Sequence, residues 1–359
     1  MIHQKKARPD LVVVLGTRSS IWDALFEAYD DAVDESALHL ADELSNLVIT
    51  GSVANGHLEE LERWLMTREG IPFRLRVVPE GLDHEGQMET LRTLAEVVPP
   101  GTELHMCVTH GLRHMPMLQM LSVFHLAQTA SVALGGLYYG SLDLGSNGLE
   151  CPVIELTAAA ELQKWSLALG TLTATGRLSA LAEAAEEADP TLAGHLRETD
   201  FRQAVNQTGR AAISATKASA DICQRGLPGA GMLFSKAASA KLTWASQRGL
   251  GEKQRLCAMH ALETGDLMRC VILCLEAFIS KAVPTGTDER NYTLREEAYQ
   301  AMLDRLSDQD RRDMKKLEHL RNAVAHGSAT DNAAVSQLLD DPPRLRGFLC
   351  RMLRKLAQS

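Results

Sequence analysis

Short apolar runs alternate with longer amphipathic segments through the first half of the chain. Residues 11–15 form a valine-rich run of the kind found in strands buried on both faces, and 21–29 follows with helical spacing. The same alternation predicts strands at 47–49, 74–78, 104–108, 132–139 and 153–156, with helices at 57–68, at 87–98 and from the turn after 108 to 128. Because helices of about ten to fifteen residues separate these strands, the pattern predicts an α/β domain with a parallel, doubly wound sheet.

From residue 158 onward the spacing of apolar residues is helical. Segments 201–218, 267–283 and 292–306 are each expected to form a helix, and 267–283, the most apolar, should lie at the centre of an all-α domain. Glu276 lies within this apolar helix, where Lys281 or Arg269 could neutralise it. A charged segment, 308–320, has apolar residues at regular intervals and predicts a helix that leads into residues 321–326. We therefore expect two domains, residues 1–157 and residues 158–359.

Charge is distributed unevenly between the two halves. The net charge is −9, but residues 1–160 hold 10 Lys and Arg against 22 Asp and Glu, a balance of −12, whereas residues 291–359 hold 12 against 10. Binding of a nucleic-acid backbone needs clustered positive charge. Contacts with nucleic acid are therefore expected to be short and C-terminal, and no DNA partner is expected.

Cysteine usage and hydropathy favour a cytoplasmic protein. The seven cysteines lack the paired spacing of a zinc site or a disulfide framework, so we expect reduced thiols and no metal centre. No segment approaches the roughly eighteen consecutive apolar residues of a membrane span, and residues 1–10 lack the apolar core of a signal peptide. No membrane partner is expected.

Two loops at the expected carboxyl ends of strands carry residues suited to an anionic ligand. Open parallel sheets bind ligands outside these strand ends, where the strand order reverses. Glycine lets the backbone approach a ligand, hydroxyls and helix N-termini donate to phosphate oxygens, and arginine adds a charged fork. The candidate ligand-binding residues are Gly16, Thr17 and Ser19 in the first loop and Thr109, His110, Gly111 and Arg113 in the second. The same loops could also serve only to cap the helices that follow them.

Residues 321–326, which read RNAVAH, offer a second kind of chemistry. Histidine titrates near neutrality, and arginine is a permanently charged group that fits phosphate oxygens. Such a pair suits metal-independent RNA cleavage, in which the ribose 2′-hydroxyl attacks its own phosphate. Arg321 and His326 are five residues apart, about 140° around a regular helix, so a regular helix cannot aim both at one target. Either the helix ends between them, which Gly327 would permit, or a second copy of the chain completes the site.

An arginine followed by asparagine, three further residues and histidine resembles the signature of HEPN ribonucleases. The first half independently resembles a CARF domain, a Rossmann-like sensor of cyclic oligoadenylates in type III CRISPR systems. That second resemblance rests on residues 15–20, LGTRSS, and on residues 109–116, THGLRHMP. The two resemblances together cover essentially the whole chain in the order of a CARF–HEPN protein. Cys107 departs from the pattern, because relatives often carry Asp two positions before the threonine.

The resemblance implies a homodimer, or a higher oligomer, in which two CARF domains enclose a cyclic oligoadenylate and thereby activate an endoribonuclease. Arg321, Asn322 and His326 would be catalytic, single-stranded RNA would be the substrate, and the products would carry 2′,3′-cyclic phosphate and 5′-hydroxyl ends. The activator is the only ligand implied, with no cofactor and no metal.

Two other interpretations of the sequence stay open. One is a cyclic-nucleotide-binding regulator with an inactive helical half. The other is a nicotinamide-dependent oxidoreductase, which the first loop disfavours because Thr17 and Arg18 stand where the nicotinamide fingerprint would place its next glycine.

Overall fold

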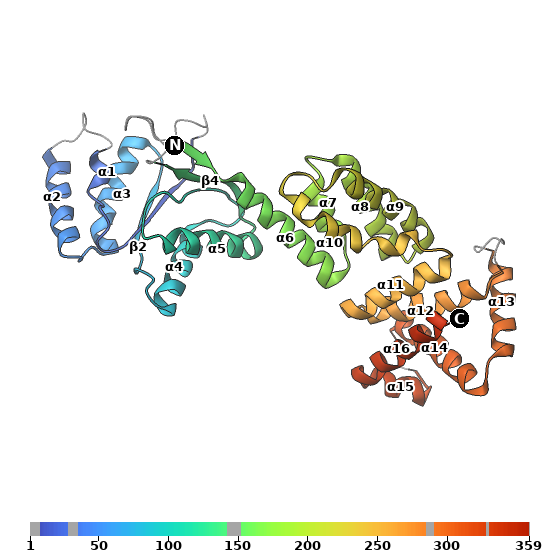
Figure 1. Ribbon diagram of the computed structural model, residues 1–359. Coiled ribbons are helices and arrows are strands. Elements are labelled where there is room, and N and C mark those ends of the chain that lie inside the picture. Colours follow the sequence, from blue (N-terminus) through green and yellow to red (C-terminus); the bar gives the residue numbers. More distant parts are fainter. Residues whose placement is uncertain (1–7, 28–34, 142–151, 285–290, 328–329, 359) are drawn as a thin grey trace. The chain divides into compact units, whose positions relative to one another are not determined.

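The computed structural model describes residues 8–27, 35–141, 152–284, 291–327 and 330–358, and the chain forms two compact units that divide between Ala160 and Glu161 (Figure 1). The strands of the first unit are β1 (Val12–Gly16), β2 (Phe73–Val77), β3 (Glu103–Cys107), β4 (Ala133–Gly140) and β5 (Val153–Glu155). Its helices are α1 (Ala24–Glu27), α2 (Glu35–Ile49), α3 (Asn55–Glu69), α4 (His84–Val97) and α5 (His114–Thr129). This is the α/β half that the sequence predicts.

The described strands form two sheets rather than the single parallel sheet that we expected. β1 pairs in parallel with β2, with Val12 opposite Phe73, and β3 pairs in parallel with β4. β5 pairs antiparallel to β4, with Tyr139 opposite Ile154. Antiparallel neighbours need no crossover helix between them, whereas parallel neighbours such as β3 and β4 are joined through a helix, here α5.

Helices cover the strands from two sides. Val12 and Val14 pack against a core cluster built on α1, α2 and α3, whereas Leu15 packs against a second cluster built on α4 and α5. Figure 1 shows α4 and α5 together on one side of the strands, with α1, α2 and α3 grouped on the other. This arrangement of helices on both faces is the one expected for a doubly wound unit.

The prediction of a strand at residues 47–49 is wrong, because these residues form the last turn of helix α2. Ala37, Leu40 and Leu44 are buried along one face of that helix, at intervals of three and four residues. Leu47 and Val48 continue the face and pack against the same cluster as α3. Three consecutive apolar residues are compatible with a strand and with the end of a helix. The three- and four-residue spacing of the apolar residues before them is what indicates the helix.

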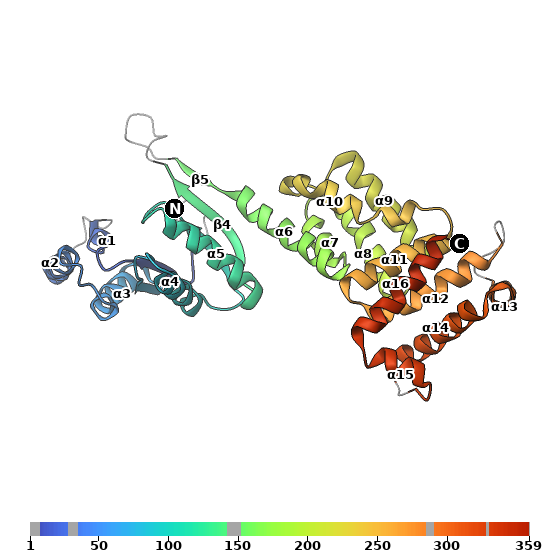
Figure 2. The same ribbon diagram turned by 60° about the horizontal axis from the view of Figure 1, so that its bottom comes forward.

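The second unit is helical. Its elements are α6 (Thr157–Thr175, which begins in the first unit), α7 (Ser179–Ala185), α8 (Pro190–Ala204), α9 (Thr208–Arg225), the 3₁₀ turns η3 (Gly229–Phe234) and η4 (Thr243–Ser246), α10 (Ser235–Ala240), α11 (Leu250–Thr264), α12 (Leu267–Ala282), α13 (Tyr292–Arg305), α14 (Asp308–His326), α15 (Ala333–Leu339) and α16 (Pro342–Gln358). α12 contacts α11, α13, α14 and α16, which confirms its predicted central position. Figure 2 shows α11, α12, α14 and α16 side by side.

The helix expected at 201–218 is interrupted. α8 ends at Ala204 and α9 begins at Thr208, and between them Asn206 adopts a left-handed conformation with φ of 56°. Asparagine tolerates this conformation better than most residues, so it serves as the turn between the two helices. The apolar residues before and after Asn206 therefore belong to the buried faces of two different helices, α8 and α9.

Candidate functional site

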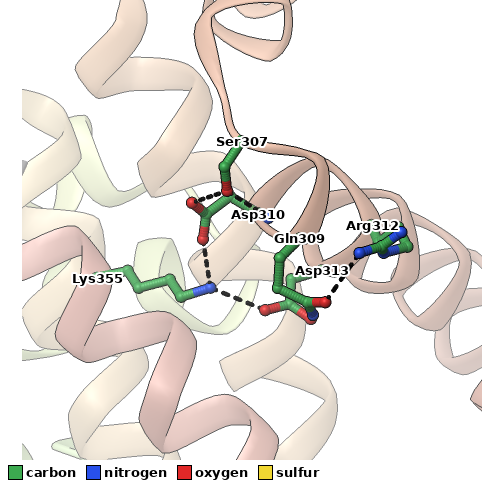
Figure 3. Close-up of polar contacts among 6 residues, drawn as sticks. All are labelled: Ser307, Gln309, Asp310, Arg312, Asp313 and Lys355. Atoms are coloured by element: carbon green, nitrogen blue, oxygen red, sulfur yellow. Dashed lines mark hydrogen bonds and ion pairs between the residues drawn. The ribbon is translucent and has the colours of Figure 1, made fainter.

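The first turns of helix α14, which carries the three candidate catalytic residues, are fixed by polar contacts (Figure 3). The Ser307 hydroxyl accepts a hydrogen bond from the Asp310 amide at 3.2 Å and donates one to the Asp310 carboxylate at 2.6 Å. Lys355 on α16 donates to Asp310 at 2.7 Å and to Asp313 at 2.8 Å. The hydrogen bond from Lys355 is the main cause that lowers the pKa of Asp310. The beginning of α14 is therefore tied to the end of α16.

Helix α14 continues without a break through both Arg321 and His326. It ends one residue later, at Gly327, which has φ of 60° and donates its amide to the Ala323 carbonyl at 3.0 Å. Such a left-handed glycine is a common way for a helix to end. The first of the two alternatives left open by the sequence is thus excluded: the helix does not end between the two residues.

The three side chains of this motif lie on the outer part of α14. Arg321 is half-buried, whereas Asn322 and His326 are exposed, and none of the three makes a hydrogen bond or an ion pair with a described residue. Because Arg321 and His326 diverge by about 140° on a regular helix, one chain does not bring them to a common target. The guanidinium and the imidazole are each available to an external group.

A buried tyrosine lies next to Arg321. Tyr299 on α13 is 5% exposed and donates a hydrogen bond to the carboxylate of Glu318, which lies one turn before Arg321 on α14. Burial and the Glu318 carboxylate raise the pKa of the Tyr299 hydroxyl, while the positive charge of Arg321 opposes the increase. We did not foresee either residue from the sequence. Glu318 could have been found from its three-residue spacing to Arg321, whereas Tyr299 belongs to another helix.

Glu276 does not have the partner that the sequence suggested. Its carboxylate accepts a hydrogen bond from Arg295 of α13 at 2.5 Å, rather than from Lys281 or Arg269. Lys281 instead donates to the Leu356 carbonyl of α16. Glu276 thus joins α12 to α13, and the acidic neighbour of the RNAVAH motif is Glu318.

The first candidate ligand loop follows β1. The Ser20 hydroxyl accepts a hydrogen bond from the Thr17 amide at 2.8 Å, and the Thr17 carbonyl accepts one from the indole of Trp22 at 2.9 Å. A Cβ atom at Gly16 would lie 2.6 Å from the Trp22 ring, so the packing of Trp22 by itself requires glycine here. Thr17 and Ser19 lie 3.4 Å apart, oxygen to oxygen, and Ser19 is exposed.

The second candidate ligand loop follows β3 and divides into fixed and free residues. The Thr109 hydroxyl accepts a hydrogen bond from the Gly140 amide at 2.7 Å, which ties the loop to the end of β4. Gly111 has φ of 110°, a conformation that disfavours other residues. His110 and Arg113 are exposed and make no hydrogen bond or ion pair with a described residue. Of the predicted residues in this loop, these two are free to meet a ligand.

The two loops leave the same part of the first unit. Leu15 and Val108, which directly precede the loops, both pack against the core cluster of α4 and α5. The Val78 amide donates to the Gly16 carbonyl at 2.8 Å, so the end of β2 is also held beside the first loop. Each loop lies at the carboxyl end of its own pair of parallel strands.

The fold and these sites define a protein with an α/β unit that carries polar loops at its strand ends, followed by a helical unit with a free arginine and histidine on one helix. No protein-family model matches the chain. A CRISPR-associated protein of Methanocaldococcus jannaschii is 23% identical over 209 residues, a match that covers 54% of this chain and 33% of that protein. The chain thus has a distant homologue among CRISPR-associated proteins, and the match spans about a third of that homologue's length.

Two further properties concern partners and metals. None of the described helices is long and apolar enough to cross a membrane. Within the described residues, no group of three or more His, Cys, Asp and Glu side chains is arranged to hold a metal ion.

Proposed function

We propose that this protein is a metal-independent endoribonuclease of type III CRISPR immunity, activated when cyclic oligoadenylate binds to its α/β unit. The observation that carries the proposal is the state of α14, on which Arg321 and His326 are both free of protein partners among the described residues. The guanidinium is permanently charged and matches phosphate oxygens, so an arginine without a carboxylate partner is available to bind a phosphodiester. The CRISPR-associated relative supports the biological setting.

The proposed reaction is an internal transesterification of single-stranded RNA. His326 takes the proton of the ribose 2′-hydroxyl, whose oxygen forms a bond to the adjacent phosphorus while the bond from phosphorus to the 5′-oxygen breaks. Arg321 stabilises the negative charge that develops on the phosphate, and the 5′-oxygen leaves with a proton taken from solvent. Asn322, which makes no hydrogen bond to either residue in its own chain, would orient the pair across the dimer. The products are a 2′,3′-cyclic phosphate and a 5′-hydroxyl.

A second copy of the chain is part of this proposal. Because α14 is unbroken, Arg321 and His326 of one chain point in different directions, and a homodimer can supply the missing group from the other side of the phosphate. A mixture of Arg321→Ala and His326→Ala chains tests the arrangement. We expect each variant alone to be inactive and the mixture, after subunit exchange, to recover part of the wild-type rate. No recovery in chains shown to exchange would argue against a shared site.

The proposed activator site uses the two free residues of the second loop and two hydroxyl groups of the first. His110 and Arg113 would contact phosphates of the adenylate ring, and Thr17 and Ser19 would donate hydroxyl hydrogen bonds to it. The first 160 residues have a balance of −12, so an anion bound here depends strongly on each nearby cation. We therefore expect Arg113→Ala to weaken activator binding by at least about tenfold, the loss of a charge-assisted hydrogen bond. Arg92→Ala, on the exposed side of α4, is the matched control.

One assay tests the enzymatic part of the proposal. Labelled single-stranded RNA is incubated with the protein in EDTA, with and without cyclic tetra-adenylate or hexa-adenylate, and the end groups of the products are determined. We expect activator-dependent cleavage that is lost in His326→Ala and retained in His319→Ala, which removes another exposed histidine of the same helix. Cleavage that persists in His326→Ala would remove the catalytic assignment. Activator binding without cleavage at any concentration would instead favour a regulator with an inactive helical unit.

A further inference from the structure

Glu318 is placed where it could neutralise Arg321, yet it does not. The two residues are three apart on α14, a spacing at which opposite charges on a helix commonly form an ion pair. Arg321 nevertheless makes no ion pair or hydrogen bond with any described residue. The carboxylate is instead engaged by the hydroxyl of Tyr299, which comes from the neighbouring helix α13.

Tyr299 is held firmly in the position from which it binds Glu318. The residue is 5% exposed and belongs to the hydrophobic core of the helical unit, so its ring cannot turn away without opening that core. Its hydroxyl therefore has a fixed location and keeps the Glu318 carboxylate on the side of α14 that faces α13. Glu296 of α13 also contributes negative charge near the hydroxyl.

We propose that Tyr299 is a positioning residue that keeps Glu318 away from Arg321 and so leaves the guanidinium free to bind the scissile phosphate. This inference rests on the proposed role of Arg321 and adds a requirement to it. An arginine that is neutralised by its own helix gives little stabilisation to a phosphate, because the carboxylate must first be displaced. The Tyr299 hydroxyl binds the Glu318 carboxylate in place of Arg321, and the positive charge of Arg321 stays available to the phosphate.

The test compares three variants of the full-length protein. Tyr299→Phe keeps the ring in the core but releases Glu318. We expect the cleavage rate constant at saturating RNA and activator to fall about two- to fivefold, the range that partly exposed ion pairs reach. Tyr299→Phe combined with Glu318→Gln should restore the rate, because the freed side chain no longer carries charge. Tyr292→Phe, at an exposed tyrosine of the same helix, should leave the rate unchanged.

The rescue separates positioning from a general structural effect. If Tyr299→Phe lowered the rate only by loosening the core, adding Glu318→Gln would not restore it, and the inference would be overturned. A Tyr299→Phe protein that cleaves at the wild-type rate would overturn it as well.

A crystal structure of the Tyr299→Phe variant gives a readout that does not depend on activity. We expect the Glu318 carboxylate within about 4 Å of the Arg321 guanidinium, the distance at which an ion pair forms. A carboxylate that stays away from Arg321 contradicts the inference even where the variant is less active. If the wild-type protein cleaves no RNA at all, the proposed function fails, and this structure still decides whether Tyr299 controls the pairing of Arg321.

Discussion

Lys355 offers the sharpest test of how the helical unit holds α14. Its ammonium group bridges Asp310 and Asp313 at the start of that helix (Figure 3), and the Asp313 side chain is only 13% exposed. Lys355→Met keeps most of the apolar stem but removes the charge, which leaves both carboxylates without their cationic partner. A hydrogen bond between charged groups contributes about 1.5 kcal/mol when it is largely buried, and we assign this value to the contact between Lys355 and Asp313. Asp310 and Lys355 are each more than a third exposed, so their contact adds only about 0.5 kcal/mol after screening.

The expected loss is therefore about 2 kcal/mol, which for a unit of this size lowers the midpoint of thermal unfolding by about 4–8 °C. Calorimetry of the full-length protein measures it, with Arg354→Met, a neighbouring exposed cation, as the control that should shift little. A double-mutant cycle with Asp313→Asn should give a coupling energy of about 1 kcal/mol. A coupling energy near zero, or equal shifts for Lys355→Met and Arg354→Met, would refute the reasoning.

Three further predictions concern stability and reactivity. Burial raises the pKa of the Cys257 thiol to about 12, so iodoacetamide at pH 8 should modify the exposed Cys107 long before Cys257, as peptide mass spectrometry would detect. Burial lowers the pKa of His260, so the unfolded chain binds more protons and stability should fall as pH drops below the ordinary value of about 6.5. His260→Gln should flatten that part of a urea-unfolding profile, and an unchanged slope would contradict the assignment. Asp200→Ala should cost about 2–3 kcal/mol in the same assay, because the buried Leu178 amide, which donates to this carboxylate at 2.7 Å, loses its acceptor.

The sequence predicted elements well where the hydrophobic period was long. Residues 308–320 have the three-residue spacing of a helix, and the structure gives α14 with those apolar residues buried. The apolar run at 47–49 was too short to show its period, and it belongs to the helix α2 that precedes it. Asn206 divides two helices that a continuous amphipathic pattern had joined, because one left-handed residue leaves the pattern on both sides intact.

The contacts around the candidate residues were harder to predict from the sequence than the elements that carry them. The second candidate ligand loop could be placed after β3 because a threonine and a glycine in the local sequence mark the end of that strand. Local sequence gives no comparable indication of which helices contact each other. The Lys355 contacts join residues more than forty positions apart, and the bond from Tyr299 to Glu318 depends on how α13 packs against α14. Sequence spacing suggested Lys281 or Arg269 for Glu276, whereas the tertiary fold supplied Arg295.

The way α14 is held restricts how its proposed activity could be controlled. Lys355 fixes the first turns of the helix, Tyr299 engages the acidic group beside Arg321, and Gly327 ends the helix just after His326. Rearranging Arg321 and His326 within one chain would require breaking these contacts, which together are worth several kcal/mol. Moving two intact copies of α14 relative to each other requires none of them to break. An activator then needs only a higher affinity for the dimer in which the two copies are correctly spaced, since a ligand that binds both states equally shifts nothing.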